Sequence, residues 1–92
     1  MSDTVHRSLK IVNEKGLHAR ASAKLVEVVE GFDAQAEVLK DGLTASGDSI
    51  MGLLMLAASK GTTIEVQTSG PDALALADAI EALVADRFGE ET

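Results

Sequence analysis

AQAEVLKDGLTA, residues 34–45, predicts a β-hairpin. In its first half, small or apolar residues alternate with mostly polar ones, which is the period-two pattern of a strand buried on one face. Asp41-Gly42 follows directly, and this dipeptide is a strong short-range signal for a two-residue hairpin turn. Residues 43–45 then make the short return strand.

Strands and helices are predicted on both sides of this hairpin. Period-two patterns at residues 5–11 and 62–68 predict two further strands, and Arg7 falls on an apolar position, so we expect it near the sheet rim. Helical spacing at residues 19–30 and 50–59 predicts two helices. Gly70-Pro71-Asp72 marks the start of a third helix, with proline in its first turn.

The order β-α-β-β-α-β-α therefore predicts an α+β fold. Every strand has one apolar face, so a four-stranded antiparallel sheet with three helices on one face is the economical packing. With 92 residues, the chain is too short for two independent cores. We expect one domain over residues 1–92, with an ordered core at about 4–88 and a frayed acidic tail at 89–92.

Composition excludes several classes of protein. The formal charge of −7 disfavours nucleic acid and anionic lipid surfaces as partners. No apolar stretch approaches the length of a membrane span, so we expect no membrane insertion. The absence of cysteine excludes disulfides and thiolate metal sites, and two distant histidines make no metal site. No glycine-rich nucleotide loop is present, so we expect no bound cofactor or metal.

His18 is the strongest candidate for chemistry. It stands at a loop-to-helix junction, where the free amides of Ala19 and Arg20 and the positive end of the helix dipole favour an anion such as a phosphoryl group. The Arg20 guanidinium adds a second source of positive charge. A neutral imidazole nitrogen there could accept a phosphoryl group. The alternative is that His18 is only a mediocre helix cap.

The second helix has two unusual features. Ser49 stands at its start, as an N-cap residue or as a site of regulatory phosphorylation. Its core face is expected to contain Ile50, Leu53, Leu54 and Ala57. Met51 and Met55 then point partly away, so they form either a docking patch or a contact with a neighbouring helix. The sequence leaves both alternatives open.

Two motifs resemble those of a known family. GLHAR at residues 16–20 and SIMGL at residues 49–53 look like the motifs of the histidine-containing phosphocarrier (HPr) family of the bacterial phosphotransferase system. The resemblance runs from Val5 to Phe88 and includes the order of the elements. It implies an open-faced β-sandwich.

The resemblance also implies a function. HPr takes a phosphoryl group from the phosphohistidine of enzyme I and passes it to a histidine of an enzyme IIA. It is a cytoplasmic carrier rather than a turnover enzyme, and we expect a monomer. By this resemblance His18 accepts the phosphoryl group through Nδ1, and Arg20 stabilises it. Ser49 matches the serine modified by HPr kinase/phosphorylase in members that have this regulator. The residues implied in docking are Ala19, Ile50, Met51, Leu54 and Met55.

Rival functions remain open at this level. Glu27 and Glu30 stand where some members present lysines to enzyme I, which raises a nitrogen or regulatory branch as an alternative to sugar transport. A regulatory binding module that acts mainly by docking through the second helix is the second hypothesis. A small-molecule-binding domain without covalent chemistry is the third.

Overall fold

The helices and strands follow the predicted order in the computed structural model, which describes residues 4–92; residues 1–3 of the expected domain lie outside the described residues. The strands are β1 (Val5–Lys10), β2 (Gln35–Lys40), β3 (Leu43–Ser46) and β4 (Thr63–Ser69). The helices are α1 (Ala19–Glu30), α2 (Ile50–Met55) and α3 (Ala73–Ala85), followed by the short turn of 3-10 helix η1 (Arg87–Gly89). None of the helices within residues 4–92 is long and apolar enough to cross a bilayer.

The four strands form one antiparallel sheet in the order β1-β4-β2-β3. The predicted hairpin joins β2 to β3, with Lys40 opposite Leu43. Asp41 and Gly42 both have positive φ angles, 51° and 81°, as a two-residue hairpin turn requires. This part of the prediction is confirmed.

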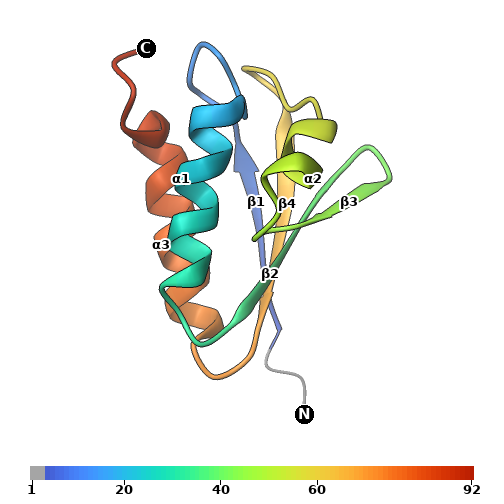
Figure 1. Ribbon diagram of the computed structural model, residues 1–92, viewed down its shortest axis with the longest axis vertical. Coiled ribbons are helices and arrows are strands. Elements are labelled where there is room, and N and C mark those ends of the chain that lie inside the picture. Colours follow the sequence, from blue (N-terminus) through green and yellow to red (C-terminus); the bar gives the residue numbers. More distant parts are fainter. Residues whose placement is uncertain (1–3) are drawn as a thin grey trace.

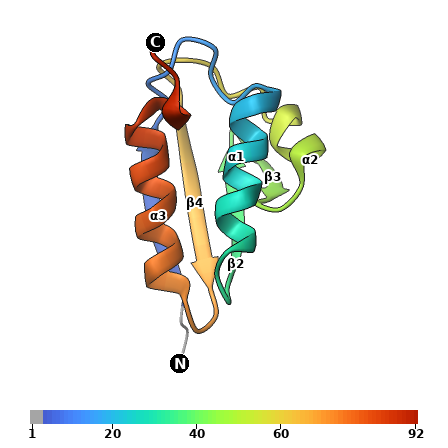
Figure 2. The same cartoon turned by 60° about the vertical axis from the view of Figure 1, so that its left-hand side comes forward.

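The helices cover one face of the sheet and leave the other open (Figures 1 and 2). On the open face, His6 and Lys10 of β1, Glu37 of β2 and Glu65 of β4 are exposed. On the covered face, Val38 is fully buried. The predicted four-stranded, open-faced architecture is therefore confirmed.

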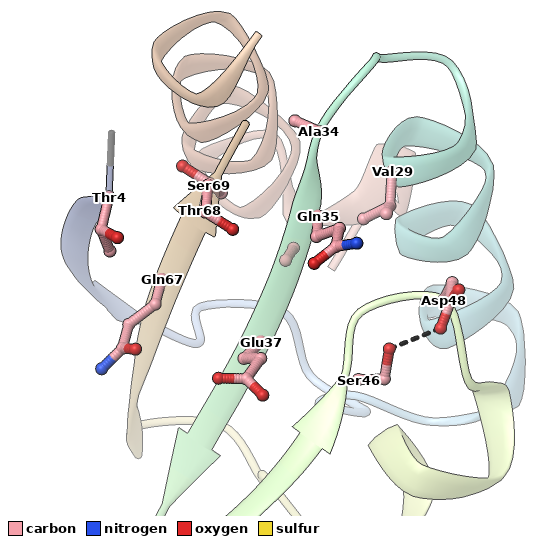
Figure 3. A pocket seen from close by; sticks show the side chains of 11 residues that line it. Thr4, Val29, Ala34, Gln35, Glu37, Ser46, Asp48, Gln67, Thr68 and Ser69 are labelled. Carbon is pink, nitrogen blue, oxygen red and sulfur yellow. Dashed lines mark hydrogen bonds between the residues drawn. The ribbon is translucent and has the colours of Figure 1, made fainter. Parts of the chain in front are cut away.

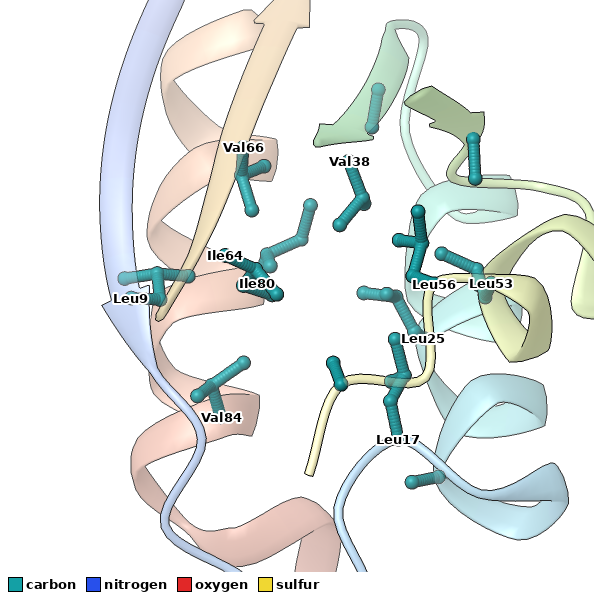
Figure 4. Close-up of a cluster of buried hydrophobic side chains, with 14 of the residues drawn as sticks. Leu9, Leu17, Leu25, Val38, Leu53, Leu56, Ile64, Val66, Ile80 and Val84 are labelled. Carbon is teal, nitrogen blue, oxygen red and sulfur yellow. The ribbon is translucent and has the colours of Figure 1, made fainter. Parts of the chain in front are cut away.

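The hydrophobic core lies between the sheet and the helices (Figure 4). Leu25 from α1, Leu53 from α2 and Ile80 from α3 are each fully buried there. Buried apolar side chains of this size each contribute roughly 1.5–3 kcal/mol of stabilisation. The core therefore fixes all three helices, and with them both helix starts at which functional residues were predicted.

Arg7 lies on β1, which is an edge strand, as expected from its position in the pattern. Its guanidinium reaches α3 and pairs with Asp78 at 3.0 Å and Glu81 at 2.5 Å. These hydrogen bonds raise the pKa of Arg7 above its ordinary value. A charged residue on an apolar position is thus accommodated by two carboxylates of the covering helix.

Helix α2 is shorter than predicted and ends at Met55 rather than at Ser59. Ala57 adopts a left-handed backbone with φ 52°, which terminates the helix, and Ala58 is buried beyond it. The expected core face was also wrong in part: Leu53 is buried, but Ile50, Leu54 and Ala57 are exposed. Leu56 and Ala58 take the buried positions instead.

Helix α3 begins two residues after the proline. Pro71 was expected in the first helical turn, but it precedes the cap residue Asp72. Asp72 and Asp33 bond each other: the amide of Asp33 donates to Oδ2 of Asp72 at 2.8 Å, and the amide of Asp72 donates to the carbonyl of Asp33 at 3.1 Å. This exchange ties the start of α3 to the turn before β2.

Candidate functional site

His18 is the N-cap residue of α1, at the junction where the sequence predicts it. Its Nδ1 accepts a hydrogen bond from the backbone amide of Arg20 at 3.3 Å. Its backbone carbonyl accepts the amide of Ser22 at 2.8 Å. The side chain is 27% exposed. The imidazole is thus held at the helix start, with one nitrogen against the positive end of the helix dipole.

The loop before His18 is fixed against the segment that follows α2. Gly16 has φ +66°, and a Cβ atom there would lie 2.4 Å from the carbonyl oxygen of Ala58, so no larger residue fits. The amide of Leu17 donates to the same oxygen at 2.8 Å. This close backbone approach places His18 beside α2.

The C-terminal residues contact His18, whereas the sequence analysis expected them to fray. Oε2 of Glu90 hydrogen-bonds Nε2 of His18, and Oε1 of Glu90 accepts Nδ2 of Asn13 at 3.0 Å. The carbonyl of Thr92 accepts the amide of Glu14 at 2.7 Å. Both ribbon views show the C-terminus beside the loop between β1 and α1 (Figures 1 and 2).

These contacts assign the proton of the neutral His18 ring. Nδ1 accepts the Arg20 amide, so the ring proton is on Nε2, which donates to the Glu90 carboxylate. Burial of the Glu90 carboxyl raises its pKa. The hydrogen bonds from Asn13 and His18, the charge of a protonated His18 ring and the charge of Lys15 outweigh this effect, so the pKa is lowered. Glu90 therefore carries its negative charge at neutral pH, and Nδ1 carries the ring's free electron pair.

Both basic and acidic side chains lie beside the His18 ring, with Glu90 and Glu91 among them. A hollow beside His18 is lined by the basic side chains of Lys15, Arg20 and Lys24, together with the C-terminal residues. Lys24 donates to the carbonyl of Phe88 at 2.6 Å and so holds the buried C-terminal turn against α1. The Arg20 side chain is exposed. A phosphoryl group on Nδ1 would lie at the Arg20 amide, at the positive end of the α1 dipole.

An exposed apolar patch lies on α2. Met51 and Met55 keep 72% and 75% of their surface exposed, so they do not cover a neighbouring helix. Ile50 and Leu54 are 39% and 38% exposed. A second shallow hollow is lined by both His18 and Leu54, so the patch reaches the edge of the histidine site. We call Ile50, Met51, Leu54 and Met55 the α2 patch.

Ser49 is the N-cap residue of α2, as the sequence predicts. Its Oγ accepts the amide of Gly52 at 3.0 Å, and its carbonyl accepts the amide of Leu53 at 3.0 Å. The neighbouring Asp48 accepts the Ser46 hydroxyl at 2.5 Å. Ser49 therefore stands beside the α2 patch and is only half-buried.

A further hollow lies at the opposite end of the sheet from His18 (Figure 3). Polar side chains such as Gln35, Gln67 and Asp48 line it, and it contains neither a basic residue nor a histidine. It therefore lacks the groups that a phosphoryl ligand needs. Among residues 4–92, no three His, Cys, Asp or Glu side chains are grouped as a metal site requires.

Sequence reasoning missed Lys15 and Lys24, which line the hollow, and also Asn13 and Glu90. Glu90 lies 72 positions from His18 and Asn13 lies 77 positions from Glu90, so no local spacing relates them. A polar Asn13 next to buried Ile11, together with an acidic residue after buried Phe88, was the only available signal.

Comparisons with known proteins agree with this geometry. A sequence model described as "PTS HPr component phosphorylation site" matches residues 5–86. The phosphocarrier protein HPr of Cupriavidus necator is 45% identical over 86 residues, which cover 94% of this chain and 97% of that protein. The phosphocarrier protein NPr of Escherichia coli K12 is 39% identical over 89 residues, covering 96% and 99%. The crystal structure of HPr-C-His from Thermoanaerobacter tengcongensis matches with a TM-score of 0.91 and 33% identity, covering 96% of this chain and 99% of that one.

Proposed function

Because this chain belongs to the HPr family of phosphocarriers of the phosphotransferase system, we propose that it accepts a phosphoryl group on His18 from the phosphohistidine of enzyme I and passes it to a histidine of an enzyme IIA. The observation that carries the proposal is the free electron pair of Nδ1 at the start of α1, beside Arg20. The protein works as a carrier, because each cycle of transfer returns His18 to its unphosphorylated form.

The transfer step follows from this geometry. Nδ1 of His18 attacks the phosphorus, and the bond between phosphorus and the donor histidine breaks, returning its electron pair to the donor ring. The new P–N bond uses the electron pair that accepts the Arg20 amide in the free protein. That amide is then available to a phosphoryl oxygen, and the guanidinium of Arg20 supplies charge-assisted hydrogen bonds.

Docking is the second part of the proposal. The α2 patch and Ala19 are exposed next to His18, so a partner that delivers a phosphoryl group to Nδ1 covers them. Exposed methionines suit a surface that must fit both a donor and an acceptor protein, because their side chains are flexible. We place the carrier in the cytoplasm as a monomer that docks one partner at a time, which sedimentation analysis would check.

Ser49 is proposed as a regulatory site. A phosphate on Ser49 would add about two negative charges at the rim of the α2 patch. Docking of an acidic partner would then be opposed by charge repulsion and by the cost of removing water from the phosphate. HPr kinase/phosphorylase is the proposed modifying enzyme where the host has one.

The experiment is phosphorylation with phosphoenolpyruvate and enzyme I, followed by intact mass and a test of acid lability. We expect one acid-labile phosphoryl group, which disappears when an enzyme IIA is added. The exposed His6 on β1 provides the matched control: His6→Ala should be phosphorylated like the wild type. Absence of any acid-labile adduct would refute the carrier function.

A second candidate function is favoured by the similarity to NPr, which covers 96% of this chain at 39% identity, against 94% at 45% identity for the similarity to HPr. In this alternative the protein belongs to a nitrogen or regulatory branch and acts mainly by docking partners through α2. Glu27 and Glu30 are exposed on α1, which would suit partners with a different charge pattern. Comparing the phosphorylation rate with enzyme I proteins of the sugar and nitrogen branches would separate the two.

A further inference from the structure

The structure places an acidic side chain on the edge of the His18 ring that the transfer step does not use. Nε2 of His18 faces Oε2 of Glu90, while Nδ1 faces the Arg20 amide. These two nitrogens lie on different edges of the imidazole, so Glu90 leaves the path to Nδ1 open. We propose that Glu90 is a positioning residue for phosphoryl transfer, resting on the function proposed above.

The carboxylate of Glu90 is itself fixed by a hydrogen bond from a buried residue. Its Oε1 accepts Nδ2 of Asn13 at 3.0 Å, and the same Asn13 amide donates to the carbonyl of Gly16 at 2.8 Å. Asn13 is fully buried, and the Glu90 side chain keeps only 14% of its surface exposed. The carboxylate is therefore fixed in orientation, which an acidic residue on a free tail would not be.

The first consequence concerns the proton of the free ring. A carboxylate accepts hydrogen bonds and donates none, so it holds the proton of the neutral imidazole on Nε2. The electron pair is then on Nδ1, the atom that attacks phosphorus. Without this partner only the hydrogen bond from the Arg20 amide, at 3.3 Å, still favours a proton on Nε2, so the ring can also place its proton on Nδ1 when it rotates away from that amide.

The second consequence concerns charge during transfer. When Nδ1 gives its electron pair to phosphorus and Nε2 keeps its proton, the ring becomes positively charged. The Glu90 carboxylate at Nε2 offsets this charge. When the P–N bond breaks toward an acceptor, the electron pair returns to Nδ1 and the neutral ring is restored. No proton has to leave or enter in either direction.

Other charges face the ring from each neighbouring segment. Lys15 lies in the loop, Arg20 and Lys24 lie on α1, and Glu91 and Thr92 lie on the tail. Glu91 is exposed, and within residues 4–92 it makes no hydrogen bond or ion pair. It is therefore the control carboxylate of the same tail, since it lacks both of the contacts that Glu90 makes, with Nε2 of His18 and with Asn13.

The test uses the full chain with three variants, Glu90→Ala, Glu90→Gln and Glu91→Gln. Nitrogen-15 chemical shifts of the His18 ring report which nitrogen holds the proton. They are recorded on the unphosphorylated protein, at a pH at which the ring is neutral. We expect the wild type, Glu91→Gln and Glu90→Gln to keep it on Nε2, because the amide oxygen of glutamine still accepts. Glu90→Ala should give a mixture.

The rate of His18 phosphorylation by enzyme I separates two effects of Glu90, which are holding the ring proton on Nε2 and offsetting the positive charge of the ring. We expect a loss between about tenfold and a hundredfold for Glu90→Ala, the range seen when partners that orient metal-binding histidines are removed. Glu90→Gln should lie between Glu90→Ala and the wild type, because it keeps the proton in place but cannot offset the charge. Melting temperatures of all variants check that the fold is retained.

Two results would overturn the proposal. One is a Glu90→Ala ring with the wild-type proton position, and the other is a Glu90→Ala protein that is phosphorylated at the wild-type rate. If the wild type itself receives no phosphoryl group, the carrier function fails, whereas the ring shifts still decide whether Glu90 positions the proton.

Discussion

His18 and Leu54 line the same shallow hollow, although His18 caps α1 and Leu54 belongs to α2. The link between them is the close approach of Gly16 to Ala58, which brings the loop before α1 against the segment after α2. A partner that reaches Nδ1 of His18 must therefore also cover part of the α2 patch. In the proposed function, docking and phosphoryl transfer therefore use one surface.

The double change Met51→Ala with Met55→Ala should weaken docking without unfolding the protein. Both side chains are largely exposed, so the free energy of unfolding should change by less than about 0.5 kcal/mol for each. The concentration of carrier that half-saturates enzyme I should rise. Leu53→Ala is the contrasting control, because truncating this buried side chain should lower the free energy of unfolding by about 2–5 kcal/mol. A large fall in melting temperature for the methionine pair, with unchanged saturation, would contradict the docking role.

His18→Ala should abolish acid-labile phosphorylation while the protein stays folded. The lost contacts are one cap hydrogen bond and the bond to Glu90, and loss of a helix cap costs about 0.5–2 kcal/mol. Intact mass after incubation with enzyme I and phosphoenolpyruvate measures the adduct. A His18→Ala protein that still gains an acid-labile phosphoryl group would remove His18 from the role.

Arg20→Ala should slow phosphoryl transfer more than it affects stability. The Arg20 side chain is exposed, so its removal should change the unfolding free energy by no more than about 1 kcal/mol. The backbone amide that contacts Nδ1 remains in the variant. Lys10→Ala removes a cation from the open face of the sheet and should transfer normally. Equal transfer rates for Arg20→Ala and Lys10→Ala would contradict a role of the guanidinium and would mean that the backbone amides of α1 stabilise the phosphoryl group without it.

Ser49→Asp should inhibit transfer to His18 in a salt-dependent way. The added carboxylate lies at the rim of the α2 patch, and its repulsion of an acidic partner weakens as salt screens it. Stability should change little, because aspartate also caps helices well. Phosphorylation rates at low and high salt, with Ser49→Ala as the uncharged control, measure the effect. Equal rates for both variants at low salt would leave Ser49 as a structural cap alone.

The contact of Glu90 should make stability depend on pH. The folded state lowers the pKa of Glu90 from its ordinary value of 4.5, so the charged form is favoured by folding. This contribution is fully present above the ordinary value and is lost as the pH falls through the lowered one. The difference in unfolding free energy between wild type and Glu90→Gln, from urea titrations, should therefore be largest near neutral pH and shrink below pH 4.5. A difference that stays constant with pH would contradict the ionic character of the contact.

Local sequence signals predicted most of the fold and the positions of two candidate residues at helix starts. Asp41-Gly42 marks the hairpin because its two residues occupy left-handed backbone, and the structure confirms this. The change of periodicity after His18, and the turn and cap residues that end at Ser49, predict helix starts at these two positions, and both residues are N-caps.

Contacts between distant segments account for what could not be predicted. Helix α2 ends before the left-handed Ala57, and the next residue, Ala58, bonds the amide of Leu17. Helical spacing alone signals neither feature, so the predicted helix extended too far. The contact of Glu90 with His18 requires the whole of α3 to be in place.

The most direct measurement locates the phosphoryl group by nitrogen-15 and phosphorus-31 NMR of the protein after phosphorylation by enzyme I. We predict a single phosphohistidine at His18, with phosphorus coupled to Nδ1 and the proton retained on Nε2 beside Glu90. A phosphoryl group on Nε2, on His6 or on Ser49 in place of Nδ1 would contradict the central claim that Nδ1 of His18 is the phosphoryl acceptor.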